Sequence, residues 1–159
     1  MNIKSIIITI LVVLWCGVIF YASSRTSTQS NGKSKEIVFK TVTATAKITN
    51  KLKLTNIDLS NDMWGKNMVK KTNKPFRKLC HATVYFILSI LIMLFLKTFN
   101  IPVKKAMIIT VIACFMYSLT DEFHQLFISG RSGQFSDCLI DTLGATIGTI
   151  ISKIIFLFL

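Results

Sequence analysis

Acidic residues are scarce in this chain, which has seven Asp and Glu against 19 Lys and Arg and a formal net charge of +12. Four of the seven, Asp121, Glu122, Asp137 and Asp141, lie within residues 117–148, between two of the most apolar segments. Ionisable groups at membrane depth cost free energy, so chains keep them there mainly to pair, to conduct or to do chemistry. We therefore look for a functional site in this stretch first.

Cysteine is also scarce, and the placement of its four residues excludes two classes of site. Cys16, Cys80, Cys114 and Cys138 lie in or at the edge of apolar runs, whereas a disulfide framework usually has its cysteines in loops. No two of them have the spacing of metal ligands. We interpret them as membrane-buried thiols.

Apolar residues make up 52% of the chain, more than the roughly 45–50% that is usual for soluble proteins. The excess lies in four runs, at residues 5–22, 79–96, 106–119 and 138–159. The third is short for a span of about 20 residues, although Lys104 and Lys105 can snorkel at one end. Alternatives are a buried helix of a soluble protein for this run and a cleaved signal peptide for the first. The first run is longer than a usual signal-peptide core, which favours an uncleaved anchor.

The sequence thus predicts an all-α integral membrane bundle of four transmembrane helices in a single domain, residues 1–159. We expect spans at about residues 5–22, 79–96, 104–121 and 138–158, a long basic polar loop at 23–78, and a short polar segment between the third and fourth spans, with partial re-entry as one alternative. This arrangement makes the chain a multi-pass protein of the cell membrane. Both termini should lie on one side of the bilayer and both polar segments on the other. Basic residues near the span ends leave the orientation undecided.

The positive charge is concentrated, because 13 of the 19 Lys and Arg lie between Arg25 and Lys78. A basic segment next to a bilayer should be drawn to anionic lipids or to envelope polymers. No recognition motif accompanies the charge, so we expect no nucleic-acid partner. The simplest interpretation is a solvated loop at the membrane interface.

Polar residues beyond the third run follow helical spacing. On a continuing helix, Tyr117, Asp121 and Gln125 recur every four residues and share a face. Two glycines then flank Arg131 and mark a turn that ends the helix. This pattern predicts that a charged helix end and a tight turn lie together.

The start of the fourth span carries two aspartates. Asp137 opens it, where either a helix cap or a site residue would be favoured. Asp141 lies one turn further and shares a face with Gly144 and Gly148, a GxxxG pattern that lets another helix approach closely. We therefore expect Asp141 to point into the bundle, and a homo-oligomer through the two glycines is a further expectation.

A second polar cluster opens the second span, where Arg77, His81 and Tyr85 recur every four residues. His81 is either a satisfied core histidine or a member of the site. Residues 23–25, Ser-Ser-Arg, leave the first span on the same side of the membrane. All four spans therefore deliver polar residues to one interface, the layout of a shared pocket.

These motifs resemble a known family. DEFHQLFISGRSGQFSDCLIDTLGATIG, at residues 121–148, is similar to the signature of VanZ-like membrane proteins, approximately D-E-x-x-Q-x-F-x-x-x-R-x-x-x-x-x-D-x-x-x-(D/N)-x-x-G-x-x-x-G. RKLCHATVYFIL resembles the family's R-K-x-x-H-x-x-x-Y second span, and Trp15 with the exit of the first span fits as well. Val84 departs from the family's common glutamate, and Ser129 departs from its common proline. The resemblance implies a cell-envelope membrane protein whose namesake confers low-level resistance to teicoplanin-type glycopeptides, without a known reaction for most relatives.

Three functions follow as hypotheses. The first is a VanZ-like envelope protein that affects susceptibility to glycopeptide or lipoglycopeptide antibiotics. The second is a membrane-embedded enzyme on a lipid-linked or cell-wall precursor, with Glu122 or Asp141 as general base and His81 as proton shuttle. The third is a structural or partner-binding protein whose charges form helix-packing ion pairs. Expected binding residues are Arg131, Asp121, Gln125, Asp137, Arg77 and Tyr85. No cofactor is expected, with a divalent cation on the acids as a minor alternative.

Overall fold

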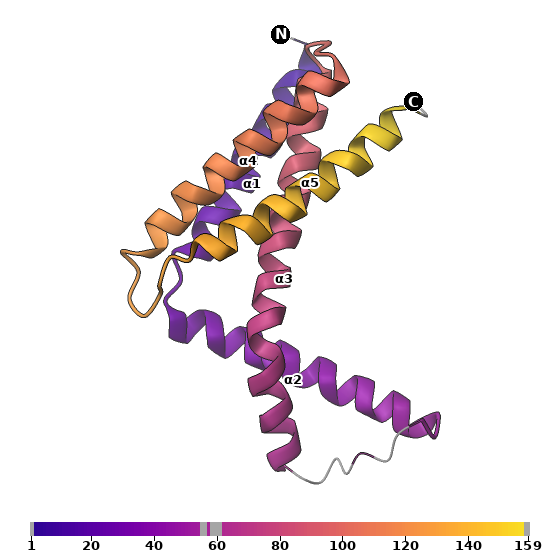
Figure 1. Ribbon diagram of the computed structural model, residues 1–159, viewed down its shortest axis with the longest axis vertical. Coiled ribbons are helices and arrows are strands. Elements are labelled where there is room, and N and C mark those ends of the chain that lie inside the picture. The colour runs from indigo at the N-terminus through magenta and orange to yellow at the C-terminus, as the bar shows by residue number, and fades with distance from the viewer. Residues whose placement is uncertain (1, 55–56, 58–61, 158–159) are drawn as a thin grey trace. The chain divides into compact units, whose positions relative to one another are not determined.

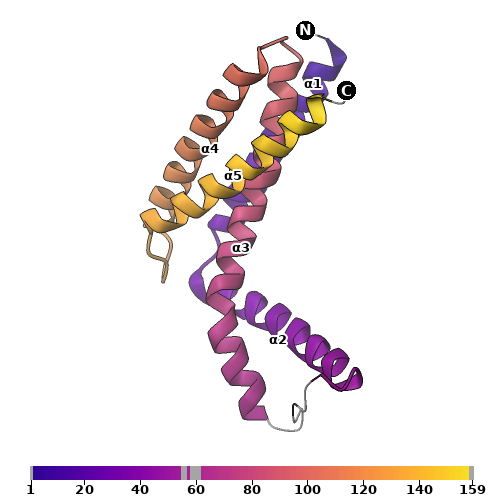
Figure 2. The ribbon, with the colours of Figure 1, turned by 45° about the vertical axis from the view of Figure 1, so that its right-hand side comes forward.

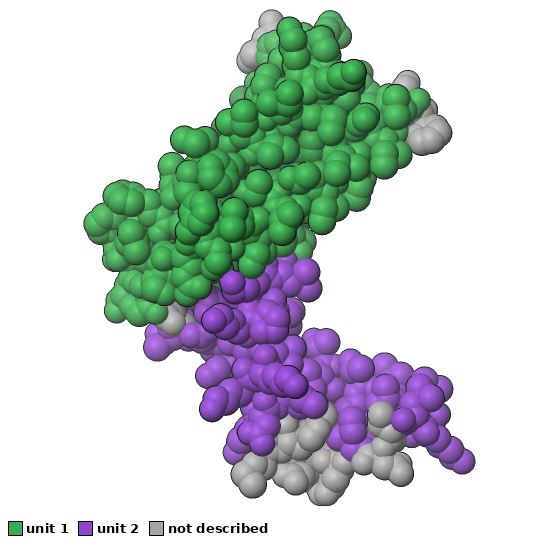
Figure 3. Space-filling model, viewed as in Figure 1, with its two compact units in different colours: residues 1–25, 80–159 green, residues 26–79 purple. Residues whose placement is uncertain are grey.

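The computed structural model describes residues 2–54, 57 and 62–157. Its helices are α1 (Ile3–Ser23), α2 (Ser27–Lys51), α3 (Asp62–Lys97), α4 (Val103–Gln125) and α5 (Phe135–Leu157), and the described residues contain no strand. The chain divides into two compact units (Figure 3): unit 1 is Met1–Arg25 with Cys80–Leu159, and unit 2 is Thr26–Leu79. The all-α prediction is confirmed, while the assignment of one domain to residues 1–159 stays a prediction.

Among the described residues, four helices are long and apolar enough to cross a membrane: α1, Lys66–Lys97 within α3, α4, and α5. This confirms the number and order of the predicted spans. The third is longer than its apolar run, because α4 begins directly after Pro102 and continues through the acidic residues to Gln125. Residue 158, the last of the predicted fourth span, lies outside the described residues.

Unit 1 has a core to which all four spanning helices contribute. Its fully or nearly fully buried members are Ile19 of α1, Tyr85 and Leu88 of α3, Cys114 of α4 and Ala145 of α5. The start of α1 and the end of α5 lie at the same end of this unit (Figures 1 and 2). The exit of α1 and the α4–α5 connection lie at its other end, as the four-span arrangement predicts.

The two glycines of the GxxxG pattern set the distance between α5 and α3, which cross in both views (Figures 1 and 2). A Cβ at Gly144 would lie 2.8 Å from the carbonyl carbon of Ala82, and one at Gly148 would lie 2.5 Å from the carbonyl oxygen of Phe86. Such approach is possible only without a side chain. The stripe therefore packs within the chain, and a homo-oligomer through these glycines stays a prediction.

Hydrogen bonds from large side chains to backbone carbonyls also join the helices of unit 1. The Trp15 indole Nε1 donates to the carbonyl of Val84 at 2.9 Å, which links α1 to α3. The Tyr117 hydroxyl donates to the carbonyl of Cys16 at 2.8 Å, which links α4 to α1. Both bonds place a rigid ring at a helix interface, so they limit the sliding of α1 along its neighbours.

Unit 2 corrects the prediction of a loop at residues 23–78, because most of it is helical: α2 and the first part of α3. Residues 55–56 and 58–61 of the predicted loop lie outside the described residues. The hydroxyls of Thr41, Thr43 and Thr45 each donate to the carbonyl four residues earlier, so these polar groups are satisfied without leaving the helix. The apolar pattern is too sparse to predict such a helix.

Buried contacts stabilise α2, whose own sequence has no regular apolar pattern. Val38 and Ala46 of α2 are buried at 2% and 3% exposure. The Ser34 hydroxyl donates to the Asn73 side-chain oxygen at 2.7 Å in a buried hydrogen bond. The buried residues of α2 thus share one side of the helix, and Ser34 on that side bonds to α3.

Candidate functional site

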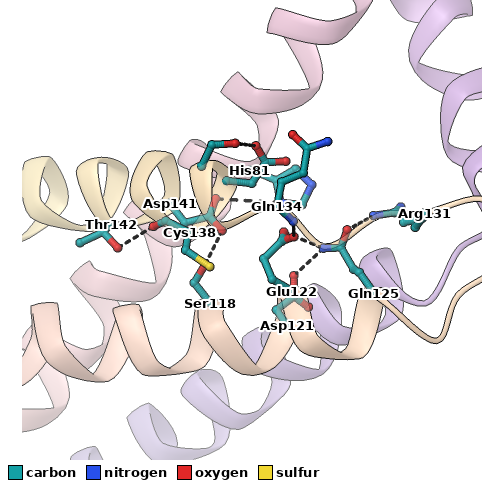
Figure 4. A network of polar contacts seen from close by, with 12 residues as sticks. His81, Ser118, Asp121, Glu122, Gln125, Arg131, Gln134, Cys138, Asp141 and Thr142 are labelled. Carbon is teal, nitrogen blue, oxygen red and sulfur yellow. Dashed lines mark hydrogen bonds and ion pairs between the residues drawn. The ribbon is translucent and has the colours of Figure 1, made fainter.

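Three carboxyl groups from α4 and α5 are buried within unit 1 (Figure 4). Asp121, Glu122 and Asp141 are 4%, 6% and 0% exposed. Because α4 continues past its apolar run, it carries the first two on successive positions of its last turn. Asp141 lies on the α5 face that carries Gly144 and Gly148, and it points inward as the sequence predicts.

Gln125 organises the two acids of α4. Its Nε2 donates to Asp121 Oδ2 and to Glu122 Oε1, both at 3.1 Å, and its Oε1 accepts from Arg131 Nη1 at 3.1 Å. Carboxylates accept and a guanidinium only donates, so these partners dictate which way the amide faces. The side chain therefore bridges an acidic pair and a cation without itself carrying charge.

The segment between α4 and α5 folds back on the acids. The backbone N–H of Gln134 donates to Glu122 Oε2 at 2.7 Å. The neighbouring Gly133 lies so close to α4 that a Cβ would be 2.5 Å from the Glu122 carbonyl oxygen, and Gly130 adopts a positive φ of 73°. Both glycines of the predicted turn are thus needed, one for close approach and the other for its backbone conformation.

Arg131 contacts the end of α1. Its Nε donates to the carbonyl of Arg25 at 3.0 Å and its Nη2 to the carbonyl of Ala22 at 3.4 Å. The last carbonyls of a helix lack intrahelical donors and carry its negative dipole end, so a guanidinium is favoured there. These contacts give Arg131 a positioning role: it holds the α4–α5 segment against α1.

Asp141 occupies the buried end of the cluster. Its Oδ2 accepts a hydrogen bond from the Ser118 hydroxyl at 2.6 Å, and its Oδ1 lies 4.0 Å from His81 Nδ1. Within the part of the chain that the structure describes, Asp141 Oδ1 is buried and makes no hydrogen bond. Buried polar atoms of this kind are exceptions in folded proteins and call for an explanation.

The remaining predicted residues have different surroundings. Asp137 lies in the first turn of α5, which begins at Phe135, so it follows the cap position and is favoured there by the helix dipole. Arg77 belongs to unit 2, where its Nη1 donates to the Asn31 side-chain oxygen at 2.8 Å. Directly after α1, the hydroxyl oxygen of Ser24 lies 3.2 Å from His124 Nε2.

The assembled groups are suited to proton transfer and to hydrogen bonding. Carboxyls, an imidazole and hydroxyls lie within one bundle, which are the groups of general acid–base chemistry. Within residues 2–54, 57 and 62–157, no group of three or more His, Cys, Asp and Glu is arranged to hold a metal ion. A divalent cation on the acids stays a prediction.

Sequence reasoning did not select three parts of this cluster as site members: Ser118, the Gln134 backbone N–H, and the carbonyls at the end of α1. Ser118 lies one helical turn before Glu122, a spacing that could have included it. A backbone group carries no signal in the sequence, and neither does a partner some hundred residues away, as between Arg131 and Arg25.

Comparison with known proteins agrees with the motifs. No curated protein and no solved structure matches the chain. The sequence model of the VanZ/LLP1 family matches residues 8–157, nearly the whole chain, which includes three of the spanning helices in full and α1 from its second turn on. This is a multi-pass membrane protein, and it belongs to the VanZ/LLP1 family.

Proposed function

We propose that this protein acts at the cell envelope, in the cell membrane, where a polar site inside the membrane influences susceptibility to glycopeptide and lipoglycopeptide antibiotics of the teicoplanin type. The observation that supports it most is the buried cluster of Asp121, Glu122 and Asp141, formed by the residues that match the VanZ-like motif. Membrane helices keep such groups at a cost that function most often explains.

A buried polar atom of the cluster that lacks a hydrogen bond supports an active role over a purely structural one. Among the described residues, Asp141 Oδ1 is buried and has no hydrogen-bond partner. A purely structural network is expected to satisfy its buried members, because an unsatisfied one costs about 1–3 kcal/mol. The site therefore has capacity to accept a proton or a hydrogen-bond donor after a small rearrangement.

The test is complementation of a deletion strain. We expect deletion to change the susceptibility to teicoplanin-class antibiotics and the intact chain to restore it. Asp141→Asn and Glu122→Gln, which keep shape and remove the acid, should not restore it. Thr120→Val is the matched control, because this exposed hydroxyl on α4 bonds only its own helix, to the Tyr117 carbonyl. Protein levels in the membrane are measured for every variant.

Two results would contradict the proposal. If deletion left susceptibility unchanged under several envelope stresses, the phenotype would not belong to this chain. If Asp141→Asn and Glu122→Gln restored susceptibility as well as Thr120→Val, the carboxyls would have no active role. The second result would leave the phenotype itself intact, so the two failures are distinguishable.

Two alternative functions have specific support. The distance of 4.0 Å between His81 Nδ1 and Asp141 Oδ1 favours an enzyme on a lipid-linked or cell-wall precursor, with this pair moving a proton. Arg131 donates hydrogen bonds to the carbonyls of Ala22 in α1 and of Arg25 just after it, which favours a structural role for the charged residues. Purified protein that turns over a labelled lipid-linked precursor would favour the enzyme. Loss of folded protein in every site variant would favour the structural role.

A further inference from the structure

The face of α2 that points away from α3 carries a row of lysines. Lys33, Lys40 and Lys47 are seven residues apart, close to two helical turns, and Lys51 follows one turn later. All four are exposed. The buried residues Val38 and Ala46 lie on the other side of the helix. Because these residues form a helix and not a loop, their charges are aligned and do not disperse.

Exposed apolar side chains flank this lysine row. Ile37 and Ile48 are 50% and 60% exposed and, being eleven residues apart, they lie on the same side of α2. Isoleucine beside lysine is costly in water but fits the boundary between headgroups and acyl chains. Lysine stems also cover apolar surface while their ammonium groups reach polar surroundings. The face thus combines positive charge with groups that can insert.

One acid lies on the same face. Glu36 pairs with Lys40 at 2.8 Å, and both side chains are more than half exposed. The hydrogen bond from Lys40 lowers the pKa of the Glu36 carboxyl, so this acid stays ionised and offsets one lysine. The net charge of the face remains positive, because Lys33, Lys47 and Lys51 are left over.

Chain connectivity keeps this face near a bilayer. α1 ends at Ser23 and α2 begins at Ser27, so only residues 24–26 separate a spanning helix from the start of α2, and the lysine row begins at Lys33, less than two turns into that helix. Anionic lipid headgroups attract juxtamembrane basic residues within about a Debye length of the surface. A soluble polyanion would match the charge, but it would give the two isoleucines nothing to insert into.

We propose that α2 docks on the surface of an anionic lipid bilayer through Lys33, Lys40, Lys47 and Lys51, with Ile37 and Ile48 inserted at the headgroup boundary. This interaction surface is separate from the carboxyl cluster of unit 1 and does not depend on the proposed function. It makes unit 2 a lipid-composition sensor of the membrane in which the spanning helices lie.

The test uses the full chain with an environment-sensitive fluorescent amino acid at Ala44, an exposed position between Lys40 and Lys47 on the same face. The chain is reconstituted into vesicles of phosphatidylcholine alone or of a two-to-one mixture with phosphatidylglycerol. We expect less quenching by aqueous acrylamide in the mixture. High salt should abolish the difference, because the Debye length falls to about 3 Å at 1 M.

Variants identify the face. Lys33→Gln and Lys47→Gln should each lower the ratio of protected to exposed probe about fivefold, the equivalent of roughly 1 kcal/mol per basic residue. Lys35→Gln removes the same charge from nearly the opposite side of the helix and should have little effect. Glu36→Gln should raise the ratio, and Ile48→Ser should lower it. Circular dichroism shows whether each variant keeps its helix.

Three results would overturn the inference. The first is equal quenching in the two vesicle compositions. The second is an effect of Lys35→Gln as large as that of Lys33→Gln, which would mean that net charge matters and the face does not. The third is protection of the probe from quenching that appears only when soluble polyglycerol phosphate is added and that is unchanged by Ile48→Ser. That result would assign the face to an envelope polymer.

Discussion

Replacing Gly144 with alanine tests the close approach of α5 to α3. The new Cβ would lie 2.8 Å from the carbonyl carbon and 2.9 Å from the Cα of Ala82, and closer still to its oxygen. Gly17 in α1 is the matched control, because nothing lies within 4 Å of a Cβ there. Both substitutions replace a glycine inside a helix, so both gain the same preference of alanine for helix, about 1 kcal/mol. The difference between them isolates the contact.

The size of that difference follows from the distances. Carbon atoms in contact prefer about 3.5–4.0 Å, so a separation of 2.8 Å must grow by about 0.7 Å or more. The obstructing atoms are backbone and cannot rotate away. A gap of about 0.5–1 Å removes a quarter to a half of each dispersion contact along the interface. Overpacking of this kind typically costs about 1–3 kcal/mol, which we expect as the stability difference between Gly144→Ala and Gly17→Ala.

The stability of Gly148→Ala should lie between those of Gly144→Ala and Gly17→Ala. Its Cβ would meet the hydroxyl of Ser89, which can rotate, as well as the Phe86 carbonyl oxygen at 2.5 Å. The assay is heat unfolding of the three variants in one detergent, followed by the fraction that still elutes as a monodisperse species. If Gly144→Ala were as stable as Gly17→Ala, the inferred packing of α5 on α3 would be wrong.

Three further substitutions test individual contacts. Ser118→Ala should cost about 1–3 kcal/mol in heat unfolding, because buried Asp141 loses its donor, and adding Asp141→Leu should recover part of the loss by removing the unpaired acceptor. Arg131→Lys should raise the rate of amide hydrogen exchange in residues 126–134 by about tenfold or more, since an ammonium lacks the planar donor geometry of a guanidinium. Its control is Arg25→Lys, which should change the rate little, because the Arg25 guanidinium bonds to the exposed hydroxyl of Tyr21. Trp15→Phe removes the indole N–H and the five-membered ring. Heat unfolding should therefore show a loss of at least about 0.5–1.5 kcal/mol from the hydrogen bond to α3, and no loss would exclude that bond.

The spans could be predicted because apolar length is a strong local signal. Each of the four runs became a helix, and α4 extended further because nothing between Leu119 and Gln125 breaks one. The helix α2 could not be predicted, since its apolar residues have no regular period and its many threonines and asparagines have low helix propensity. Val38 and Ala46 are buried in it and Ser34 donates to Asn73 of α3, a contact between segments that no local pattern reveals.

The candidate site divides in the same way. Spacing of four residues placed Asp121 beside Gln125, and the GxxxG pattern oriented Asp141 inward, so local geometry sufficed for both. Their remaining partners come from other parts of the chain. Ser118 of α4 donates to Asp141 of α5, and Arg131 donates to main-chain carbonyls that any residue would supply. The sequence predicts Arg131 as a binding residue because its charge is evident there, whereas the carbonyls that it contacts are not.

The hydrogen bonds between α1 and the rest of unit 1 require a particular side chain at the donor position but not at the acceptor position. In three of them a specific donor, Trp15, Tyr117 or Arg131, meets a main-chain oxygen. The acceptor needs no particular side chain, so mutations at Cys16 or Arg25 leave these bonds possible while mutations of the donors remove them. Alignments of relatives should therefore show the donor positions restricted and the acceptor positions free to drift. The two halves of each bond would not covary, and methods that infer contacts from paired substitutions would miss this interface.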